Sequence, residues 1–291
     1  MNKNFAVFIL SHGRPKNIKT YTSLRKSGYT GKIYILVDNE DKKISEYEKN
    51  FPNQIIVFDK KEAAKITDAG DNFGKRNSVV YARNQNFKVA SDLGLTHFWQ
   101  LDDDYTTFRW TFDNDKNYIT KQPLIKNLDA CLDAMMDFMD STTIHCLAFS
   151  QGGDFIGGPG SGVSKQHMAG KLPRKVMNSF MYRADRPLKF YGRMNDDVNM
   201  YVVNGNRGML LFTLARLRLE QAETQASEGG LTEMYLESGT YVKSFYTVMY
   251  APSCTKIRPM GNVHKRLHHQ IKWKNAVPCI VSENLRKQDH E

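Results

Sequence analysis

The stretch Thr96-His-Phe-Trp-Gln-Leu101, followed at once by Asp102-Asp103-Asp104, decides how this 291-residue chain is interpreted. A short apolar run that ends in three carboxylates is typical of a buried strand that opens onto a polar site. Adjacent carboxylates repel one another, so the triplet costs free energy unless a cation neutralises it. Mg²⁺ and Mn²⁺ prefer oxygen ligands and can keep a phosphate oxygen as a further ligand. The stretch predicts a divalent cation at a strand end; the alternative is a solvated acidic turn.

Three similar runs come earlier in the chain. They are Phe5–Leu10, which enters the loop Ser11-His12-Gly13-Arg14-Pro15, then Lys32–Val37, which ends at Asp38, and Gln54–Phe58. Helices are expected between the runs, over residues 16–27, 41–50 and 75–94. Strands that alternate with helices predict an α/β fold with a mostly parallel sheet flanked by helices. In such sheets ligands bind at the carboxyl ends of the strands.

The second half of the chain is less regular. We expect helices over 123–140 and 214–225 and strands over 144–149, 200–211 and 241–250. The segment Gln151–Gly170 holds seven glycines, which indicates a flexible loop or a loop that brings its backbone close to a ligand. No linker or internal repeat is evident, so we expect one composite domain over 1–291.

The composition is that of a globular protein, with 41% apolar and 25% charged residues. The N-terminal apolar run is too short for a signal peptide or a membrane span, and no segment reaches 18 apolar residues. We therefore expect a soluble, cytoplasmic protein. Its four cysteines are far apart and form no CxxC pair, which favours reduced thiols.

The net charge of +10 is concentrated in two blocks. Gln151–Gly192 has 7 basic and 2 acidic residues, and Thr255–Glu291 has 8 basic and 3 acidic residues. The rest of the chain is neutral. Clustered positive charge on a neutral background favours a polyanionic partner, nucleic acid first, although a solvated basic face would look the same.

The first 105 residues resemble the nucleotide-sugar domain of GT-A type glycosyltransferases. The resemblance rests on the loop after the first strand, on Asp38, on Ala82-Arg83-Asn84, and on the strand that ends in Asp102-Asp103-Asp104. It implies a nucleotide-sugar-binding half over 1–110 and an acceptor-binding half over 111–291. It also implies a UDP-sugar donor and Mn²⁺ or Mg²⁺ as cofactor. The donor-binding residues would be Ser11, Arg14, Asp38, Arg76, Arg83, Asp102 and Asp103, with Asp102 and Asp104 as metal ligands.

A second acidic pair, Asp196-Asp197, follows Gly192-Arg193. Sugar transfer requires a base for the acceptor hydroxyl, and a carboxylate can serve. Inverting members of the GT-A family usually place an acidic pair before a helix for this purpose, which makes Asp197 or Asp196 the candidate base. The alternative is an acidic helix start. Family members often return a C-terminal His or Asp to the metal, and His264 is the candidate here. His268 and His269 are rival candidates, and a histidine-rich basic loop can also be purely a surface feature.

The acceptor is inferred from the basic blocks. Lysines and arginines can neutralise phosphates and aromatic side chains can stack on bases. Phe180, Tyr182, Phe190 and Tyr191 are interleaved with the first block and Trp273 with the second, although each alone is more often a core residue. The candidate nucleic-acid-binding residues are Lys165, Lys171, Arg174, Lys175, Arg183, Lys265, Arg266, Lys272 and Lys274.

This combination resembles the phage glycosyltransferases that modify hydroxymethylated pyrimidines, including the TET-associated glycosyltransferases. The resemblance implies a hexosyl- or pentosyltransferase that acts on 5-hydroxymethylcytosine in double-stranded phage DNA, in the host cytoplasm. Three alternatives remain open at this point. The acceptor could be a polysaccharide, a lipid-linked sugar or a protein, the acidic cluster could serve a two-metal nuclease or nucleotidyltransferase, or the chain could be a non-catalytic DNA-binding module.

Overall fold

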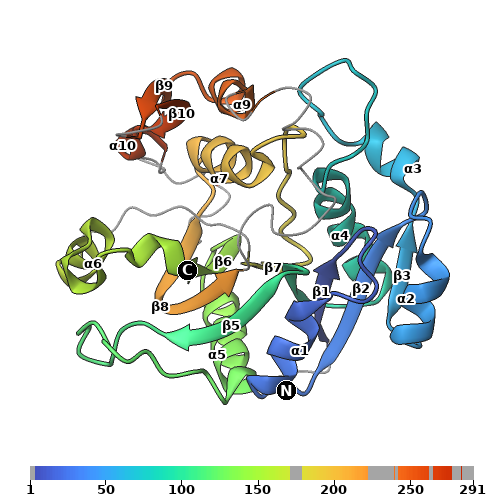
Figure 1. Ribbon diagram of the computed structural model, residues 1–291, viewed down its shortest axis with the longest axis horizontal. Helices are drawn as coiled ribbons and strands as arrows, with labels where there is room; N and C mark the ends of the chain where they lie inside the picture. Colours follow the sequence, from blue (N-terminus) through green and yellow to red (C-terminus); the bar gives the residue numbers. More distant parts are fainter. Residues whose placement is uncertain are drawn as a thin grey trace, which may run out of the picture.

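The computed structural model describes residues 4–170, 179–221, 239, 242–261, 265–276 and 283. Its centre is an eight-stranded sheet in the order β3-β2-β1-β4-β7-β6-β8-β5. A separate two-stranded ribbon, β9-β10, lies at the periphery near α7, α9 and α10 (Figure 1). The strands are β1 (Phe5–Leu10), β2 (Lys32–Asp38), β3 (Ile55–Phe58), β4 (His97–Asp102), β5 (Tyr105–Trp110), β6 (Cys146–Gln151), β7 (Ser179–Arg183), β8 (Leu211–Gln221), β9 (Thr255–Met260) and β10 (Arg266–Ile271).

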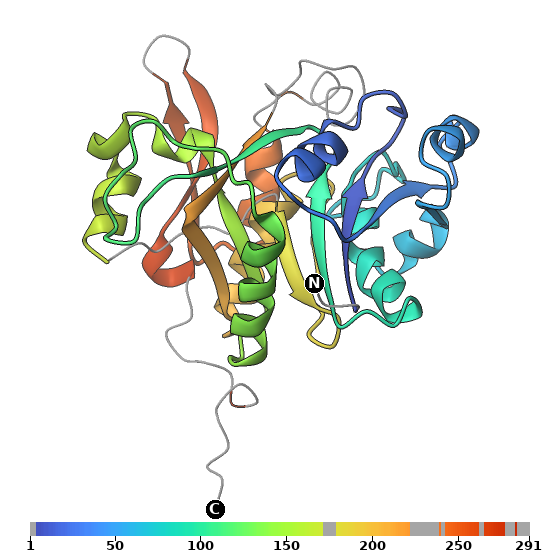
Figure 2. The same cartoon turned by 90° about the horizontal axis from the view of Figure 1, so that it is seen from below.

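Helices cover both faces of the sheet, as an α/β fold requires. They are α1 (Lys19–Lys26), α2 (Ile44–Asn50), α3 (Lys60–Lys65), α4 (Val80–Asp92), α5 (Leu128–Asp140), α6 (Gly162–Met168), α7 (Asp196–Asn206), α9 (Val242–Tyr250) and α10 (Trp273–Ala276). One core cluster joins the sheet to α3, α4 and α7. A second joins its other face to α1, α2 and α5, and α5 lies along that face (Figure 2).

The strand directions place several loops on one edge. β1, β2, β3 and β4 are parallel, as predicted. β7 is antiparallel to both β4 and β6, so β6 runs in the same direction as β4, and β8 is parallel to β6. The loops after β1, β2, β4, β6 and β8 therefore leave the sheet at the same edge. The predicted α/β architecture is confirmed, and the strands beyond β4 form a mixed rather than a parallel half.

Three predicted elements of the second half have the wrong type. The stretch 200–211, predicted as a strand, is mostly the helix α7, which is buried on nearly all sides, so its apolar run has no helical period. The stretch 214–225, predicted as a helix, lies largely in the strand β8, where Ala215, Leu217 and Leu219 are buried alternately with charged residues. The stretch 241–250, predicted as a strand, is the helix α9 despite its aromatic and β-branched residues.

Other predictions needed smaller corrections. The helix expected over 75–94 begins only at Val80, and a separate helix, α3, precedes it. The glycine-rich segment is not one open loop, because it forms the short helices η1 (Gly152–Phe155), η2 (Gly158–Gly160) and α6. The buried ring of Phe155 anchors it against Phe112. Among the described helices, none has the length and apolar character of a membrane span.

Candidate functional site

Asp103 connects the end of β4 to the loop after β1. Its carboxylate accepts a hydrogen bond of 2.6 Å from Ser11 Oγ and one of 3.1 Å from Arg14 Nη1. Burial raises the pKa of Asp103, and the contacts with Ser11 and Arg14 act against this effect. All three residues were predicted to bind the nucleotide sugar. In the structure they contact one another, and these contacts fix the loop after β1 next to the Asp102–Asp104 triplet.

Asp104 has the environment of a cation ligand. Its Oδ1 atom is buried, and no described residue donates a hydrogen bond to it. Its Oδ2 atom accepts one from Gln221 Nε2 at 3.1 Å. Burial, and then the charge of Asp102, raise the pKa of Asp104 to about 6. A buried carboxylate with an unsatisfied oxygen beside a second carboxylate fits an oxygen-binding divalent ion.

Arg83 joins the triplet to the second acidic pair. The guanidinium lies with Nη2 3.1 Å from Asp102 Oδ1 and Nη1 2.9 Å from Asp196 Oδ2. Its carbon packs over the rings of Phe180 and Phe190, at 5.4 and 5.5 Å from their centroids. Burial opposes the charge of Arg83, but Asp196 and Asp102 outweigh it and raise the pKa of Arg83. The side chain is only 4% exposed, so it holds these aspartates rather than offering its charge to solvent.

The two residues of the second acidic pair differ in exposure. Both open α7, and Asn195, with a φ of 53°, turns the chain into the helix. Asp196 is buried and faces Arg83; burial raises its pKa, and the nearby guanidinium acts in the opposite direction. Asp197 is partly exposed, and among the described residues it accepts a hydrogen bond only from the backbone N–H of its neighbour Val198. Asp197 is therefore the more accessible carboxylate of the pair.

Asp38, one of the residues predicted to bind the nucleotide sugar, already forms ion pairs within the protein. His12 Nδ1 lies 2.7 Å and Lys60 Nζ 3.2 Å from its Oδ2 atom. The hydrogen bond to Asp38 raises the pKa of His12, whose side chain stays 54% exposed. Burial alone would raise the pKa of Asp38, but His12 and Lys60 reverse that and lower it. His12, and not Asp38, therefore presents the exposed polar group of this pair.

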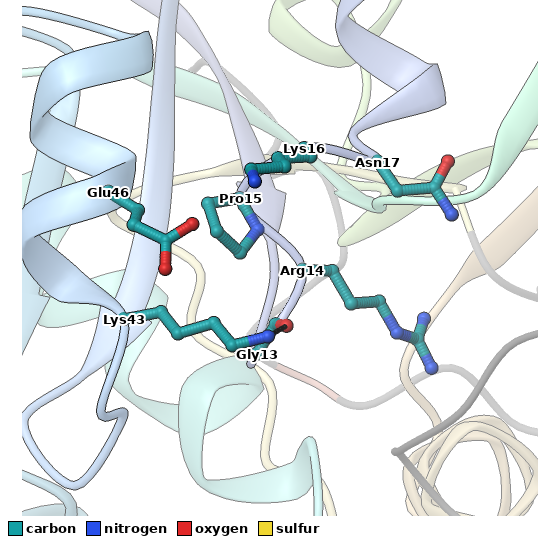
Figure 3. Close-up of a pocket in the computed structure, with 7 residues that line it drawn as sticks. All are labelled: Gly13, Arg14, Pro15, Lys16, Asn17, Lys43 and Glu46. Carbon is teal, nitrogen blue, oxygen red and sulfur yellow. Dashed lines mark hydrogen bonds between the residues drawn. The ribbon is translucent and has the colours of Figure 1, made fainter.

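Arg76 does not lie on the helix that carries Arg83. It belongs to the loop before α4 and pairs at 2.5 Å with Glu40, in the loop after β2. A hollow of about 340 Å³ lies beside the loop after β1. Its lining residues are Gly13, Arg14, Pro15, Lys16, Asn17, Lys43 and Glu46 (Figure 3). None of the three aspartates lines this hollow.

The predicted acceptor-binding residues divide into three groups. Arg183 lies opposite His97, at the other edge of the sheet, and pairs with Asp140 and Asp185, so its charge is not directed toward the site. Lys165 is exposed on α6, and Lys265, Arg266, Lys272 and Lys274 are exposed in or beside β10. Lys171, Arg174, Lys175 and the candidate metal ligand His264 lie outside the described residues.

The interleaved aromatic side chains are core residues. Phe180, Tyr182, Phe190 and Tyr191 are all less than 9% exposed, and Trp273 stacks on Tyr201. The four buried rings cannot stack on a base, and Trp273 is partly buried against the core. The four buried rings belong to a buried strand and the loop after it. This outcome agrees with the alternative interpretation of the sequence, in which these aromatic side chains are core residues.

Three residues at the site were not predicted: Gln221, Lys60 and Lys243. Gln221 reaches Asp104 because 214–225 is mostly strand and not helix. Lys243 is part of α9, where burial and then the charge of Arg266 lower its pKa, and the charge of Asp197 acts against this effect. Among the described residues, no group of three or more His, Cys, Asp or Glu side chains is arranged to hold a metal.

Comparison with known proteins places the chain in a family. No curated protein matches it. Among solved structures it is similar to glucosyl-3-phosphoglycerate synthase from Mycobacterium tuberculosis in complex with Mg²⁺ and uridine diphosphate (9% identity, TM-score 0.46, 92% of this chain and 87% of that one). It is also similar to TarS from S. aureus in complex with UDP (11% identity, TM-score 0.46, 84% and 64%).

A third similar structure is a mannosyltransferase from Pyrobaculum calidifontis in complex with GDP-Man and Mn²⁺ (11% identity, TM-score 0.46, 77% and 58%). The family assignment does not depend on these loose overlaps. The model of the TET-associated glycosyltransferase family matches residues 5–230, which is most of the chain. The chain therefore belongs to the TET-associated glycosyltransferase family and is a glycosyltransferase.

Proposed function

We propose that this chain moves a sugar from a UDP-sugar to the hydroxymethyl group of modified cytosine in duplex DNA, with inversion at the anomeric carbon. The observation that carries the proposal is the buried, unsatisfied Asp104 Oδ1 atom beside Asp102, at the sheet edge where the loops after β1 and β2 also emerge. The family match supports the transfer of a glycosyl group. The basic surface supports a polyanionic acceptor.

Asp102 and Asp104 would hold Mn²⁺ or Mg²⁺. Such an ion would neutralise the negative charge of the diphosphate leaving group. Asp102 has 24% of its side chain exposed, so it can contact a ligand while its ion pair with Arg83 fixes its position. The nucleobase of the donor would lie near His12. Asp38 engages the Nδ1 atom of His12, and the other ring nitrogen, Nε2, takes no part in that contact. His264 remains the predicted third ligand.

Asp197 is our proposed base. In the transfer, its carboxylate takes the proton from the acceptor hydroxyl as that oxygen bonds to the anomeric carbon. The bond from this carbon to the phosphate oxygen breaks, and UDP leaves with the electron pair. The partial exposure of Asp197 supports this role, and the burial of Asp196 against Arg83 supports a positioning role for that residue.

The hydroxymethyl group on C5 of a paired cytosine projects into the major groove, so the enzyme would either reach it there or turn the acceptor base out of the duplex. The test is to incubate the protein with Mn²⁺, UDP-sugars and DNA containing 5-hydroxymethylcytosine, then measure the digested nucleosides by mass spectrometry. The proposal predicts one nucleoside heavier by a sugar residue, formed about 10²- to 10⁴-fold more slowly with Asp197→Asn. Transfer to a polysaccharide or protein and not to the DNA would overturn the proposed acceptor.

A further inference from the structure

The ribbon formed by β9 and β10 has one strongly basic face. Lys256 pairs with Gln270, Arg258 with His268, and Met260 with Arg266. Cross-strand partners lie on the same face of a ribbon, and alternate residues along a strand lie on opposite faces. Lys256, Arg258 and Arg266 therefore share one face, and all three are exposed.

The opposite face of the ribbon packs on the protein. It carries Ile257, His269 and Ile271, which are partly buried, and both strands contact α9. His269 Nδ1 lies 3.1 Å from Asn195 Nδ2. The ribbon is thus fixed by its inner face, and the three basic side chains of its outer face are exposed.

The positive charge of this region is not offset locally. The sequence between Glu237 and Glu283 contains seven lysines and arginines and no aspartate or glutamate. Within the described part of the chain, no carboxylate forms an ion pair with Lys256, Arg258 or Arg266. Exposed cations without carboxylates nearby favour a polyanion and not a mixed-charge protein surface.

We propose that the outer face of the β9-β10 ribbon is the surface that binds the acceptor duplex, through its phosphates and along the major groove. The inference rests on the proposed function and names its docking surface. A two-stranded ribbon fits the major groove of DNA, which is about 12 Å wide. Lys256 and Arg258 are the residues to mutate, because together with Arg266 they extend the basic face along the whole ribbon.

The ribbon is also connected to the acidic pair. His269 contacts Asn195, which directly precedes Asp196 and turns the chain into α7. Lys243 lies within electrostatic reach of both Arg266 and Asp197. The ribbon that would hold the duplex therefore lies beside the start of α7, the helix that carries the proposed base.

The test compares Lys256→Ala/Arg258→Ala with Lys26→Ala/Lys32→Ala, which also removes two exposed positive charges but at the end of α1 and the start of β2, the opposite edge of the sheet. Binding to a short duplex is followed by fluorescence anisotropy between about 50 and 200 mM salt. Loss of two phosphate contacts should make the salt slope shallower by about 1.8 and raise the Kd by roughly 60-fold at about 0.1 M salt. The control pair should bind like the wild type.

Two further measurements separate this inference from the proposed function. UDP-sugar hydrolysis without DNA should be unchanged in Lys256→Ala/Arg258→Ala. If the wild type transfers no sugar to DNA and the ribbon variant still loses duplex binding, the ribbon inference stands and the proposed acceptor fails. The inference is overturned if the ribbon variant binds the duplex like wild type, or if it loses as much affinity for anionic vesicles or for the single strand as for the duplex.

Discussion

The guanidinium of Arg83 lies between Asp102, at the end of β4, and Asp196, the first residue of α7. One buried cation thus links the proposed metal-binding strand to the helix that carries the proposed base. Because Arg83 comes from α4, the neighbouring elements α4 and β4 are held at one point with α7, which lies about a hundred residues further along the chain. This arrangement makes Arg83 a positioning residue and gives the first prediction.

Arg83→Met should destabilise the protein by about 3–5 kcal/mol, because it leaves Asp196 buried without its cation. Adding Asp196→Leu should recover most of this loss, since the unpaired charge is then gone. Chemical denaturation of the single and double variants measures both values. Equal stability of the two variants would show that the ion pair does not carry the linkage.

Asp197→Asn should reduce sugar transfer by about 10²- to 10⁴-fold, the usual contribution of a general base. Its stability should remain near that of the wild type, because Asp197 is partly exposed. Asp196→Asn is the matched control: it should lower stability through Arg83 and alter the pH dependence of transfer less. A pH–rate profile for each variant distinguishes a base from a structural carboxylate. Full transfer activity in Asp197→Asn would remove it as the base.

Asp104→Asn should raise the melting temperature in the presence of a chelator. The raised pKa of Asp104 means that its ionised form is disfavoured in the folded protein, chiefly by burial and then by Asp102. The neutral amide removes that penalty, by an amount of about 1 kcal/mol or more after allowance for its partial exposure. The same change should abolish activity. A lower melting temperature than wild type in chelator would mean that Asp104 supports the fold.

Asp71 should make stability depend on acid pH. Burial opposes its ionisation, but hydrogen bonds from Arg193 and Tyr246 outweigh this and lower its pKa below 3.8. The stabilisation is therefore present above pH 3.8 and is lost as the pH falls through the lowered pKa. Asp71→Asn should cost about 2–3 kcal/mol at pH 7 and almost nothing at the lowest pH. Melting curves over this range test it, and a constant difference would contradict it.

The first half of the fold could be predicted from sequence because each strand there is a compact apolar run that ends in polar residues. Phe5–Leu10 and His97–Asp102 are buried along almost their whole length, and turn residues mark their ends. The second half could not be predicted in the same way. The helix α7 is buried on most sides, so its apolar residues do not repeat with a helical period. In β8, buried apolar residues alternate with charged residues that face outward, and this pattern is easily missed in the sequence.

The site divides along a similar line. The aspartate triplet and the acidic pair could be predicted because adjacent carboxylates repel one another, which costs free energy unless a cation neutralises them. Their partners could not: Asp103 turns to Ser11 and Arg14, and Arg83 turns to Asp196, through contacts between residues about 90 and more than 110 positions apart. Such distant pairings follow from strand order, which local patterns do not contain.

The most direct test of the account is calorimetric titration of UDP into the protein with and without Mn²⁺, for wild type and for Asp104→Asn. The account predicts that the wild type binds UDP tightly only when Mn²⁺ is present and that Asp104→Asn loses this metal-dependent binding. Equal UDP affinity in the chelated wild type, or undiminished Mn²⁺-dependent binding in Asp104→Asn, would contradict it.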